Sequence, residues 1–439
     1  MRITATDVAL VANGTLIGPG VDANGISFDS RQIVPGSAFV AIVAKRDGHQ
    51  FLADAVAGGA SFLIVERGRA LDGVTCVEVD DTVLALAKIA AHCRQRFTDA
   101  AGQCVVGITG SVGKTTTKAF VAAVLARGFF HVHAAESSFN NDIGVPVSII
   151  NAPDVCEAMV LEMGMRGFGE IARLCEYAQP TIAVITVIGD AHSERVGGRD
   201  GIIRAKGELI EALDEDGIAV LNADDSGAMS LADRCAGGVI TYGEALSADV
   251  GYEITDRDDM GCATVDFSFD GETETTTLTL PGDHMASNAA AAVAVGIASG
   301  MMLSECVAGL NDVQGTSGRM RWMTSRQGIR ILDDSYNANT ASLTAALDTI
   351  SLVPAVRRVA VLGAMAELSD MEESHRRIEM HALSLGIEVL PLETDLYGAS
   401  ALSLEEVMAV LEELTSDDVV VVKGSRSSAT ERVVAALLG

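Results

Sequence analysis

One segment of the chain has the composition and spacing of a phosphate-binding loop. It reads Gly-Ile-Thr-Gly-Ser-Val-Gly-Lys-Thr-Thr from residue 107 to residue 116, between an apolar run and a stretch with helical spacing. Lys114 can meet the β- and γ-phosphates of a nucleotide, and the Thr115 hydroxyl can bind Mg²⁺. Five residues, not the usual four, separate Gly107 from Gly113, so a glycine-rich turn with a chance lysine is the alternative. The flanking strand and helix favour the nucleotide site, with contacts from Gly110, Ser111, Gly113, Lys114, Thr115 and Thr116.

Polar side chains follow three further apolar runs. Glu162 lies at the end of the run 159–163, His192 follows the run 182–187, and the Asn-Ala-Asp-Asp segment 222–225 follows the run 218–221. Ligands of open α/β sheets bind outside the carboxyl ends of the strands, so these side chains are expected to converge on the glycine-rich loop. Alone, Glu162 or His192 would more often be structural. Beside a magnesium nucleotide, Glu162 is better interpreted as a ligand of the hard cation, for which the softer imidazole of His192 is less suited.

Lysine is scarce, with six in 439 residues, so a lysine in a motif-like setting is informative. Lys206 lies within a helical stretch, and from its spacing alone an ordinary exposed helix lysine is the favoured interpretation. Lys423 and Arg426 lie between a strand-like run and a helix-like run, which suits a carboxylate or a phosphate.

The C-terminal third contains groups suited to a nucleoside. Asp333 and Asp334 end a strand-like run and can present carboxylates to ribose hydroxyls. Arg319 can bind a phosphate through two hydrogen bonds. Upstream, His284 and Asn288 lie one helical turn apart, where they can frame a nucleobase or simply cap their helix.

The order of apolar runs divides the chain into three segments. Residues 1–102 alternate short apolar runs with helical stretches, as in a small α/β unit. Residues 103–313 follow a strand-then-helix order typical of a parallel sheet covered on both faces, broken at 244–281 by the period-two alternation of an antiparallel hairpin. Residues 314–439 resemble a small dinucleotide fold, but no G-x-G-x-x-G turn follows a strand there, so no dinucleotide is inferred. We predict an α/β fold of three domains: a central P-loop parallel-sheet ATPase flanked by a small N-terminal α/β domain and a C-terminal Rossmann-like α/β domain.

The composition excludes several classes of protein. A formal net charge of −29 argues against a nucleic-acid partner, because phosphate backbones require a basic face; a solvated surface or a saline habitat explains such acidity. The eight scattered cysteines, with no C-x-x-C pair, are expected to be reduced and mostly buried. The most apolar run, 286–303, contains polar residues and glycines and favours a buried helix over a membrane span. No signal peptide is visible, and we expect a cytoplasmic monomer.

The motifs together resemble the Mur ligase family along nearly the whole chain, and most closely its branch that joins D-Ala-D-Ala to UDP-MurNAc-tripeptide. The glycine-rich loop and Glu162 are common to the superfamily, whereas the Asp-Asp-Ser-Tyr-Asn-Ala-Asn and Lys-Gly-Ser-Arg segments are similar to this branch. The resemblance rests on Asp29-Ser-Arg31, Asp47-Gly-His-Gln-Phe51, the loop itself, Phe139-Asn-Asn141 with Ile143-Gly-Val-Pro146, Glu162-Met-Gly164, Gly169-Glu-Ile171, Ala205-Lys-Gly-Glu208, Leu221-Asn-Ala-Asp-Asp225, Asp333-Asp-Ser-Tyr-Asn-Ala-Asn339, Val361-Leu-Gly363 with Glu367-Leu368, and Lys423-Gly-Ser-Arg426.

The resemblance implies roles for the domains and for individual residues. The N-terminal domain would bind the UDP-sugar, the central domain ATP and Mg²⁺, and the C-terminal domain the incoming amine. Lys206 would be carbamylated, and its carbamate would bind a second Mg²⁺ alongside His192, which reverses the interpretation from spacing. The implied catalytic residues are Lys114, His192 and Lys206. The implied metal ligands are Thr115, Glu162, His192 and Lys206. Further ATP contacts would come from Asn288, Arg319 and Asp334. Substrate contacts would come from Ser30, Arg31, Asp47, His49, Asn140, Asn141, Tyr336, Asn337, Asn339, Lys423 and Arg426.

The implied reaction is the formation of an amide through an acyl phosphate. The tripeptide carboxylate would attack the γ-phosphate of ATP, and the free amine of D-Ala-D-Ala would then displace phosphate. A related ligase with another amino acid or peptide acceptor is one alternative, and a non-catalytic nucleotide-binding partner is another. A GTPase switch is weaker, because no Asn-Lys-x-Asp motif is present.

Overall fold

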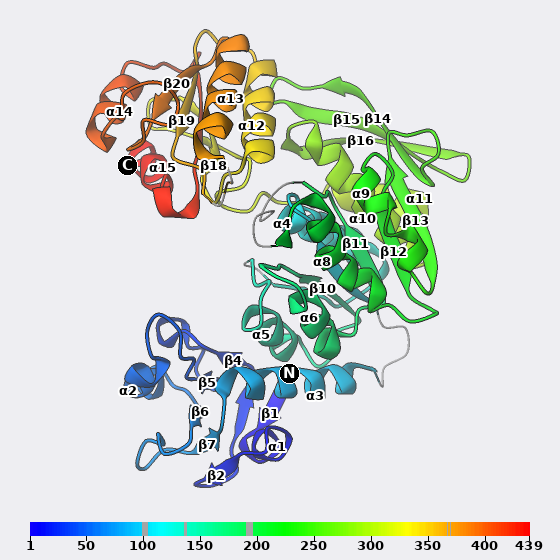
Figure 1. The fold of residues 1–439 in the computed structure, drawn as a ribbon, viewed down its shortest axis with the longest axis vertical. Helices are drawn as coiled ribbons and strands as arrows, with labels where there is room; N and C mark the ends of the chain where they lie inside the picture. Colours follow the sequence, from blue (N-terminus) through cyan, green and yellow to red (C-terminus); the bar gives the residue numbers. More distant parts are fainter. Residues whose placement is uncertain (99–103, 136–137, 190–195, 367, 369) are drawn as a thin grey trace.

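The computed structural model describes residues 1–98, 104–135, 138–189, 196–366, 368 and 370–439, arranged as three α/β domains (Figure 1). Each of three separate sheets falls within one of the segments 1–102, 103–313 and 314–439. The fold class predicted from the sequence is therefore confirmed. No helix in the described ranges combines the length and apolar character needed to cross a membrane.

The N-terminal domain is built on a five-stranded sheet in the order β2-β7-β6-β5-β4. A separate antiparallel pair, β1 with β3, lies beside it. The long helix α3 contacts α5 and α6 of the next domain, so it joins the two units. The bounds are β1 Arg2–Thr4, α1 Ala5–Val11, β2 Thr15–Ile17, β3 Asp22–Asn24, β4 Ile26–Ser27, β5 Ala38–Val40, α2 Leu52–Ala57, β6 Phe62–Glu66, β7 Cys76–Val79 and α3 Thr82–Thr98.

The central domain contains a nine-stranded sheet in the order β16-β15-β14-β13-β12-β11-β8-β10-β9. Its strands from β9 to β14 are parallel, and β14, β15 and β16 are antiparallel. The hairpin predicted from the alternation at 244–281 corresponds to β15 and β16, and β14 adds a third antiparallel strand to it. The strand bounds are β8 Cys104–Thr109, β9 Val132–Ala134, β10 Ala158–Glu162, β11 Ile182–Ile185, β12 Ile218–Asn222, β13 Gly238–Gly243, β14 Val250–Arg257, β15 Cys262–Phe269 and β16 Glu272–Pro281.

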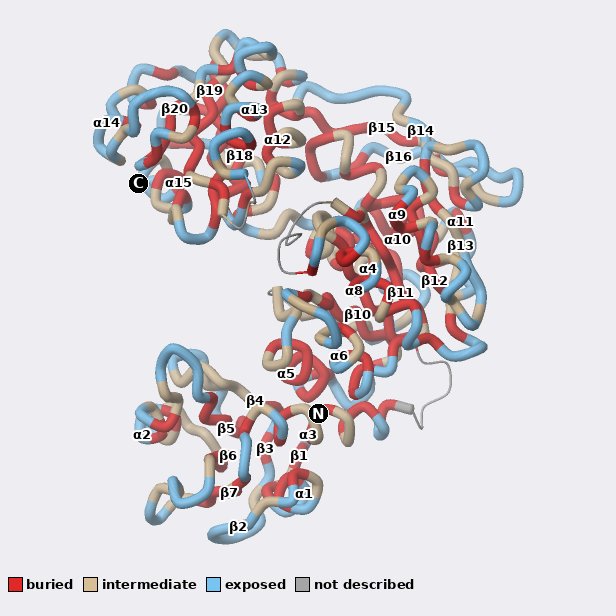
Figure 2. The backbone as a smooth tube through the Cα atoms, viewed as in Figure 1, coloured by how far each residue is buried: buried red, intermediate tan, exposed pale blue. Residues whose placement is uncertain are grey.

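Helices cover both faces of the parallel part of the central sheet, which is why β8, β10, β11 and β12 are apolar on both sides (Figure 2). Helices α4, α10 and α11 pack together on one face, and α5, α6 and α8 belong to the core on the other face, which continues into α3. The bounds are α4 Lys114–Gly128, α5 Gly144–Asn151, α6 Glu170–Ala178, α8 Arg199–Glu211, α9 Ser226–Met229, α10 His284–Ala298 and α11 Leu303–Leu310.

The C-terminal domain has a five-stranded sheet in the order β17-β18-β21-β19-β20, with an antiparallel edge strand β17 and four parallel strands. Its edge touches the central domain, where the Trp322 indole N–H donates to the Met260 carbonyl oxygen at 2.9 Å. The bounds are β17 Arg321–Thr324, β18 Arg330–Asp334, α12 Thr340–Leu352, β19 Arg358–Leu362, α13 Met371–Ser384, β20 Glu388–Pro391, α14 Leu404–Leu411, β21 Val419–Lys423 and α15 Glu431–Leu438.

Candidate functional site

The glycine-rich loop connects the central strand β8 to helix α4 in a conformation that requires glycine. Gly110 has φ 155° and Gly113 has φ 83°, both in the region that side chains disfavour. A Cβ at Gly110 would lie 1.8 Å from Thr186 Oγ1, and one at Gly113 would lie 2.6 Å from Asn288 Oδ1. No side chain caps the N-terminus of α4, so its first N–H groups and its positive dipole end remain suited to an anion.

Lys114 lies over this loop. Its ammonium donates to the Gly110 carbonyl oxygen at 2.7 Å, which places the charge where the loop would surround phosphate groups. Burial lowers the pKa of Lys114 from its usual range, and the nearby Glu162 carboxylate opposes that shift. A phosphate would compensate the buried ammonium, as expected of a lysine that binds the β- and γ-phosphates.

Thr115 and Glu162 lie together at the edge of the loop. The Thr115 hydroxyl donates to Glu162 Oε2 at 2.8 Å, and the Asn140 amide donates to Glu162 Oε1 at 2.9 Å. Glu162 ends β10, the parallel neighbour of β8, and is only 3% exposed. A hydroxyl and a carboxylate side by side form an all-oxygen donor set that fits Mg²⁺.

Lys206 on α8 is buried, so the interpretation of an ordinary exposed helix lysine is wrong. The helix turns this side chain towards the sheet rather than towards solvent, and the residue is 3% exposed. Burial lowers the pKa of Lys206 well below its usual value, and the positive charge of Lys114 lowers it further. Within the part of the chain that the structure describes, no carboxylate pairs with its ammonium, a state that favours the neutral amine.

The predicted role of His192 lies outside the described residues. Among the residues that are described, no group of three or more histidines, cysteines and carboxylates is arranged to hold a metal ion. The predicted ligand set of Thr115, Glu162, His192 and Lys206 therefore stays a prediction, although Thr115 and Glu162 are in direct contact.

Asn288 approaches the loop from α10. Its Oδ1 accepts a hydrogen bond of 3.1 Å from the Thr117 hydroxyl and lies against Gly113. His284, one turn earlier, is half-buried at the contact with the C-terminal domain, where burial and the Lys423 charge lower its pKa to about 4. The two side chains thus have different surroundings, and only Asn288 adjoins the glycine-rich loop.

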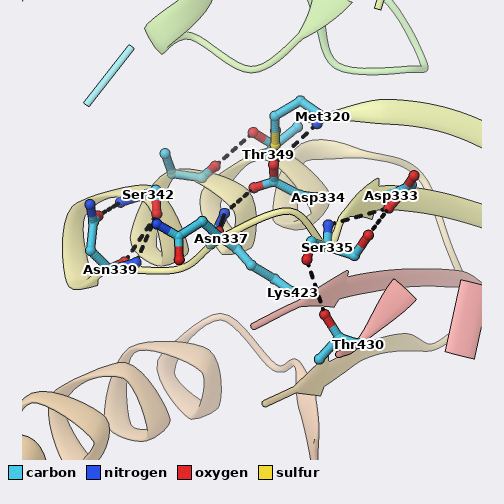
Figure 3. Close-up of polar contacts among 11 residues, drawn as sticks. Met320, Asp333, Asp334, Ser335, Asn337, Asn339, Ser342, Thr349, Lys423 and Thr430 are labelled. Carbon is cyan, nitrogen blue, oxygen red and sulfur yellow. Dashed lines mark hydrogen bonds and ion pairs between the residues drawn. The ribbon is translucent and has the colours of Figure 1, made fainter. Parts of the chain in front are cut away.

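The segment 333–339 of the C-terminal domain organises the turn that carries Arg319 (Figure 3). Asp333 Oδ2 accepts from the Gly318 N–H at 2.9 Å, and Asp334 Oδ1 accepts from the Met320 N–H at 3.2 Å. Both carboxylates therefore have partners inside the domain. Ribose binding by Asp334 stays a prediction, while its observed contacts position the backbone on either side of Arg319.

Lys423 is buried against the same segment. Its ammonium forms an ion pair with Asp334 Oδ2 and donates to the Asn337 carbonyl oxygen at 2.9 Å (Figure 3). Burial raises the pKa of Asp334, and the ammonium opposes this shift. Asn339 Oδ1 accepts from the Ser342 N–H at 2.9 Å and so caps α12. Lys423, Asn337 and Asn339, which are predicted to contact substrate, thus have internal partners in this structure. Their role in substrate binding stays a prediction.

Two guanidinium groups flank Tyr336 at the surface. Arg319 Cζ lies 4.2 Å from the centre of the ring, and Arg426 Cζ lies 5.7 Å from it. Tyr336 and Arg426 are exposed, as is Asn337. The tyrosine and the two arginines form a cationic surface that suits an anionic group of a substrate.

A cavity of about 850 Å³ lies between the N-terminal and central domains. Its lining includes Phe28 and Asp29 from one domain and Phe139 and Asn151 from the other, with the Phe28 and Phe139 rings 5.8 Å apart. Arg31 folds back onto Asp29, with Nε 2.9 Å from Oδ1. The predicted residues Ser30 and Arg31 follow Asp29 directly at this cavity.

Asp47 and His49 hold a turn of the N-terminal domain. His49 Nε2 accepts from the Glu66 N–H at 3.0 Å, so Nδ1 carries the proton and donates to Asp47 Oδ1 at 2.7 Å. This hydrogen bond lowers the pKa of Asp47 to about 2, and Arg69 pairs with the other carboxylate oxygen. Both ring nitrogens of His49 are thus satisfied internally, and its contact with substrate stays a prediction.

Sequence reasoning missed two residues that connect domains at this site. Ser138 contacts both Thr115 and Arg319, and Asn151 pairs with the backbone of Ile26 in the N-terminal domain. Ser138 directly precedes the Phe139-Asn-Asn141 segment, but nothing in the sequence gives either side chain its partner, since both act across the tertiary structure. Lys118 was also passed over, although it lies one helical turn after Lys114; its ammonium donates to the Ala135 carbonyl oxygen.

Comparisons with known proteins agree with this arrangement. Residues 108–296 match the family profile described as Mur ligase middle domain, and residues 318–426 match the one described as Mur ligase, glutamate ligase domain. The chain is 35% identical over 443 residues to the UDP-N-acetylmuramoyl-tripeptide--D-alanyl-D-alanine ligase of Synechocystis sp., covering 97% of this chain and 94% of that protein. It is 33% identical over 453 residues to the Escherichia coli (strain K12) ligase of the same name, covering 100% and 98%.

Solved structures show the same likeness in three dimensions. A crystal structure of MurF from Acinetobacter baumannii superimposes with a TM-score of 0.86 at 29% identity, covering 100% of this chain and 99% of that one. MurF ligase from Thermotoga maritima in complex with ADP gives a TM-score of 0.79 at 28% identity, covering 94% of this chain and 96% of that one. The likeness thus extends over all three domains.

Proposed function

The chain belongs to the Mur ligase family, and we propose that it joins D-alanyl-D-alanine to UDP-N-acetylmuramoyl-tripeptide while ATP is converted to ADP and phosphate. This reaction makes a precursor of peptidoglycan. Identity of 33% to 35% to ligases of that name over nearly the whole of both chains supports the assignment.

One structural observation carries the proposal. Arg319 of the C-terminal domain donates to Ser138 at 3.0 Å, and Ser138 contacts Thr115 of the glycine-rich loop at 3.2 Å. A domain suited to an incoming amine is thereby joined to the phosphate-binding loop. A ligase needs this juxtaposition, because an acyl phosphate formed at the loop must meet the amine before water does.

The central domain supplies the ATP site. The N-terminal N–H groups of α4 and the Lys114 ammonium would bind the phosphates, and Asn288 would approach the nucleotide from α10. Arg319 would neutralise charge on the transferred phosphoryl group. The ADP complex of the relative from Thermotoga maritima supports nucleotide binding by this fold.

Magnesium would be held by oxygen atoms at the edge of the loop. The Thr115 hydroxyl and the Glu162 carboxylate fit such a hard cation, and the cation would supply charge neutralisation of the phosphates. Asn140 orients the carboxylate through its hydrogen bond to Oε1. The protein's contribution here is to hold these oxygens in place.

We also propose that Lys206 is carbamylated. Burial and the neighbouring Lys114 charge lower the pKa of Lys206 and so favour its neutral amine, and a neutral amine adds to CO₂ to give a carbamate with release of one proton. The resulting anion would sit beside Lys114 and would act with His192 on a second Mg²⁺. The buried side chain would then gain favourable interactions with the cations around it.

The chemistry proceeds by two transfers. The tripeptide carboxylate oxygen attacks the γ-phosphorus of ATP, the bond from phosphorus to the bridging oxygen breaks, and ADP leaves. The amine of D-alanyl-D-alanine then attacks the acyl carbon, and the tetrahedral adduct expels phosphate as the amine loses its proton. Lys114 and Arg319 stabilise the charge that develops in the first transfer.

The cavity between the N-terminal and central domains is where we place the nucleotide-sugar half of the acid substrate. We expect Ser30, Arg31, Asn140 and Asn141 to contact this substrate. In support, Arg31 pairs with Asp29 of the cavity lining, and Asn140 pairs with Glu162 beside the glycine-rich loop. The exposed Tyr336 and Arg426 would face the amine substrate. A cytoplasmic location fits the eight unpaired cysteines, of which seven are buried.

A phosphate-release assay tests the activity directly. Purified protein with ATP, Mg²⁺ and UDP-N-acetylmuramoyl-tripeptide should release phosphate only after D-alanyl-D-alanine is added, with the amide product detected by mass spectrometry. Release with another amine and none with this dipeptide would favour a related ligase. Binding of ATP without any amine-dependent phosphate release would favour a non-catalytic partner.

A further inference from the structure

Ser138 lies where the central and C-terminal domains meet. It belongs to the connection between β9 and α5, and its hydroxyl oxygen is 3.2 Å from Thr115 Oγ1 and 3.0 Å from a terminal nitrogen of Arg319. Thr115 in turn lies 2.8 Å from Glu162. Four side chains from two domains therefore form one continuous hydrogen-bonded chain.

The direction of each hydrogen bond in this chain is determined by its two ends. A guanidinium group only donates, and an ionised carboxylate only accepts. The Thr115 hydroxyl has one hydrogen, which it donates to Glu162, so Ser138 must donate its own hydrogen to Thr115 and accept from Arg319. A cation at one end and an anion at the other polarise both hydroxyls in the same sense and strengthen the chain.

We propose that Ser138 is a positioning residue that holds Arg319 over the phosphate loop, and so sets the approach of the C-terminal domain to the bound ATP. This inference rests on the proposed ligase function and extends it to a residue that no local motif identifies. Ser138 acts through Arg319 and has no part in the bonds that form or break.

The other contacts of Arg319 do not fix its position relative to the central domain. Its guanidinium stacks on Tyr336, and its backbone lies in the turn held by Asp333 and Asp334, all within its own domain. Those contacts orient the guanidinium relative to the C-terminal domain only. Across the described ranges, Ser138 is the hydrogen-bond acceptor found for the Arg319 side chain, and it belongs to the central domain.

Ser138 itself is held firmly by the residues that follow it. Asn140 donates to Glu162 and accepts from the Gly164 N–H at 2.8 Å, and Asn141 Oδ1 accepts from the Gly144 N–H at 2.9 Å. Phe139 packs so closely on Gly144 that a Cβ there would lie 2.7 Å from it. The backbone that follows Ser138 is thus fixed by contacts within the central domain.

The hydrogen-bonded series from Arg319 to Glu162 is compatible with a cation bound to Thr115. Its hydroxyl oxygen has two lone pairs, and Ser138 uses one of them. The second stays available to Mg²⁺ while the hydrogen still points to Glu162. Arg319 can therefore keep its position in the nucleotide-bound enzyme.

A double-mutant cycle tests the proposal in the full-length enzyme. Loss of one charge-assisted hydrogen bond should lower kcat in Ser138→Ala about 5- to 20-fold, with KM for ATP changed less than about 2-fold. Arg319→Ala should be slower still. Because Ser138 acts through Arg319, the double variant should be no slower than Arg319→Ala alone. The matched control Ser138→Thr keeps the hydroxyl and should retain most of the activity.

A second measurement separates positioning from general damage and from failure of the proposed reaction. Hydrogen–deuterium exchange at 316–320 in the protein without substrates should become faster in Ser138→Ala and stay unchanged in Ser138→Thr, whichever amine is the acceptor. Unchanged exchange in Ser138→Ala, or a double variant slowed by the product of the two single effects, would overturn the proposal. Failure of dipeptide-dependent turnover with altered exchange would instead contradict the proposed function alone.

Discussion

Lys114 and Lys206 show how two residues of one type can have different surroundings, and so suit different purposes, near the same loop. Lys114 keeps a half-buried ammonium at the loop, close to Glu162, whereas Lys206 has no carboxylate partner in the described ranges and its burial favours the neutral amine. The first suits a permanent cation for phosphates, and the second suits a nucleophile towards CO₂. The difference arises from their neighbours and not from their spacing along the chain.

Replacing Lys114 by alanine should reduce turnover by at least about 100-fold, because the buried charge that would meet the phosphates is removed. Phosphate release under saturating substrates measures the effect, with Lys88→Ala on α3 as a control that should behave like the wild type. Glu162→Ala and His192→Ala should also lose activity, to lesser degrees. Wild-type activity in Lys114→Ala would contradict the assignment of the loop.

Lys206→Ala should be inactive and partly restored by short carboxylic acids such as formate or acetate. The small anion would enter the space left by the side chain and take the place of the carbamate. Activity measured against acid concentration gives the rescue, and Lys114→Ala treated in the same way is the control that should stay inactive. A Lys206→Ala enzyme with full activity in the absence of added acid would argue against carbamylation.

The positions of the candidate site residues could be predicted where local chemistry is distinctive, whereas their binding roles stay predictions. The glycines, Lys114 and Thr115 form a contiguous pattern, and Glu162 follows from the strand order of a parallel sheet. It failed for the burial of Lys206, since helical spacing does not say which face meets the sheet. It also missed Ser138, whose role depends on the approach of a residue 181 positions away.

At the scale of elements, a contact between α5 and β4 joins the N-terminal domain to the central domain. Asn151, the last residue of α5, accepts from the Ile26 N–H at 2.7 Å and donates to the Ile26 carbonyl oxygen at 3.0 Å. Gly25 makes room for this amide, since a Cβ there would lie 2.4 Å from Asn151 Oδ1. The side chain thus pairs with strand β4 as another strand would.

Asn151→Ala should therefore weaken binding of the nucleotide-sugar more than binding of ATP. Two hydrogen bonds that hold β4 at the cavity are lost, so KM for the UDP substrate should rise about 5- to 30-fold while KM for ATP changes little. Steady-state kinetics with each substrate varied gives the two values. Asn311→Ala, which removes a single exposed hydrogen bond to Thr276, is the matched control. An equal rise in both KM values would count against a local effect.

Element types were well predicted because the apolar periods are clear in this chain. The hairpin predicted within 244–281 appears as β15 and β16, with β14 as an additional antiparallel strand, and the buried parallel strands match apolar β-branched runs. Strand β17, Arg321–Thr324, was not predicted, because its charged, aromatic and sulfur side chains show no simple alternation. Its strand conformation comes from antiparallel pairing with β18, which is a tertiary effect.

At the scale of the whole molecule, the chain has a large excess of negative charge, with a formal net charge of −29 over 439 residues. Like charges spread over the surface repel one another and favour the expanded chain. Four of the six lysines, Lys114, Lys118, Lys206 and Lys423, have internal positions or partners, so they do little to balance this surface.

The melting temperature should accordingly rise when potassium chloride is increased from 0.05 M to 1 M, as the screening length shrinks to about 3 Å. Differential scanning fluorimetry measures the shift, which we expect to be several degrees. Sucrose at matched osmolality is the control for a general solute effect and should give a smaller rise. A melting temperature that falls with added salt would show that specific surface ion pairs outweigh the repulsion.

The order and class of the three domains followed from the sequence, whereas their arrangement did not. Which faces touch is decided by single contacts such as Asn151 with Ile26 and Trp322 with Met260. No periodicity encodes such pairs. The cavity between the first two domains and the meeting of Arg319 with Ser138 are consequences of that arrangement, so they became visible only in three dimensions.

Trp322 is the only tryptophan of the chain, and its indole N–H donates across the junction between the C-terminal and central domains. Seven of the eight thiols are buried, so Cys235 in the central domain is the one that a dye reagent can reach. The unaltered protein thus carries a fluorescence donor on one side of the junction and a selective labelling point on the other. Any change in the distance between these two domains would alter the energy transfer, so it can be measured in real time without engineered probes.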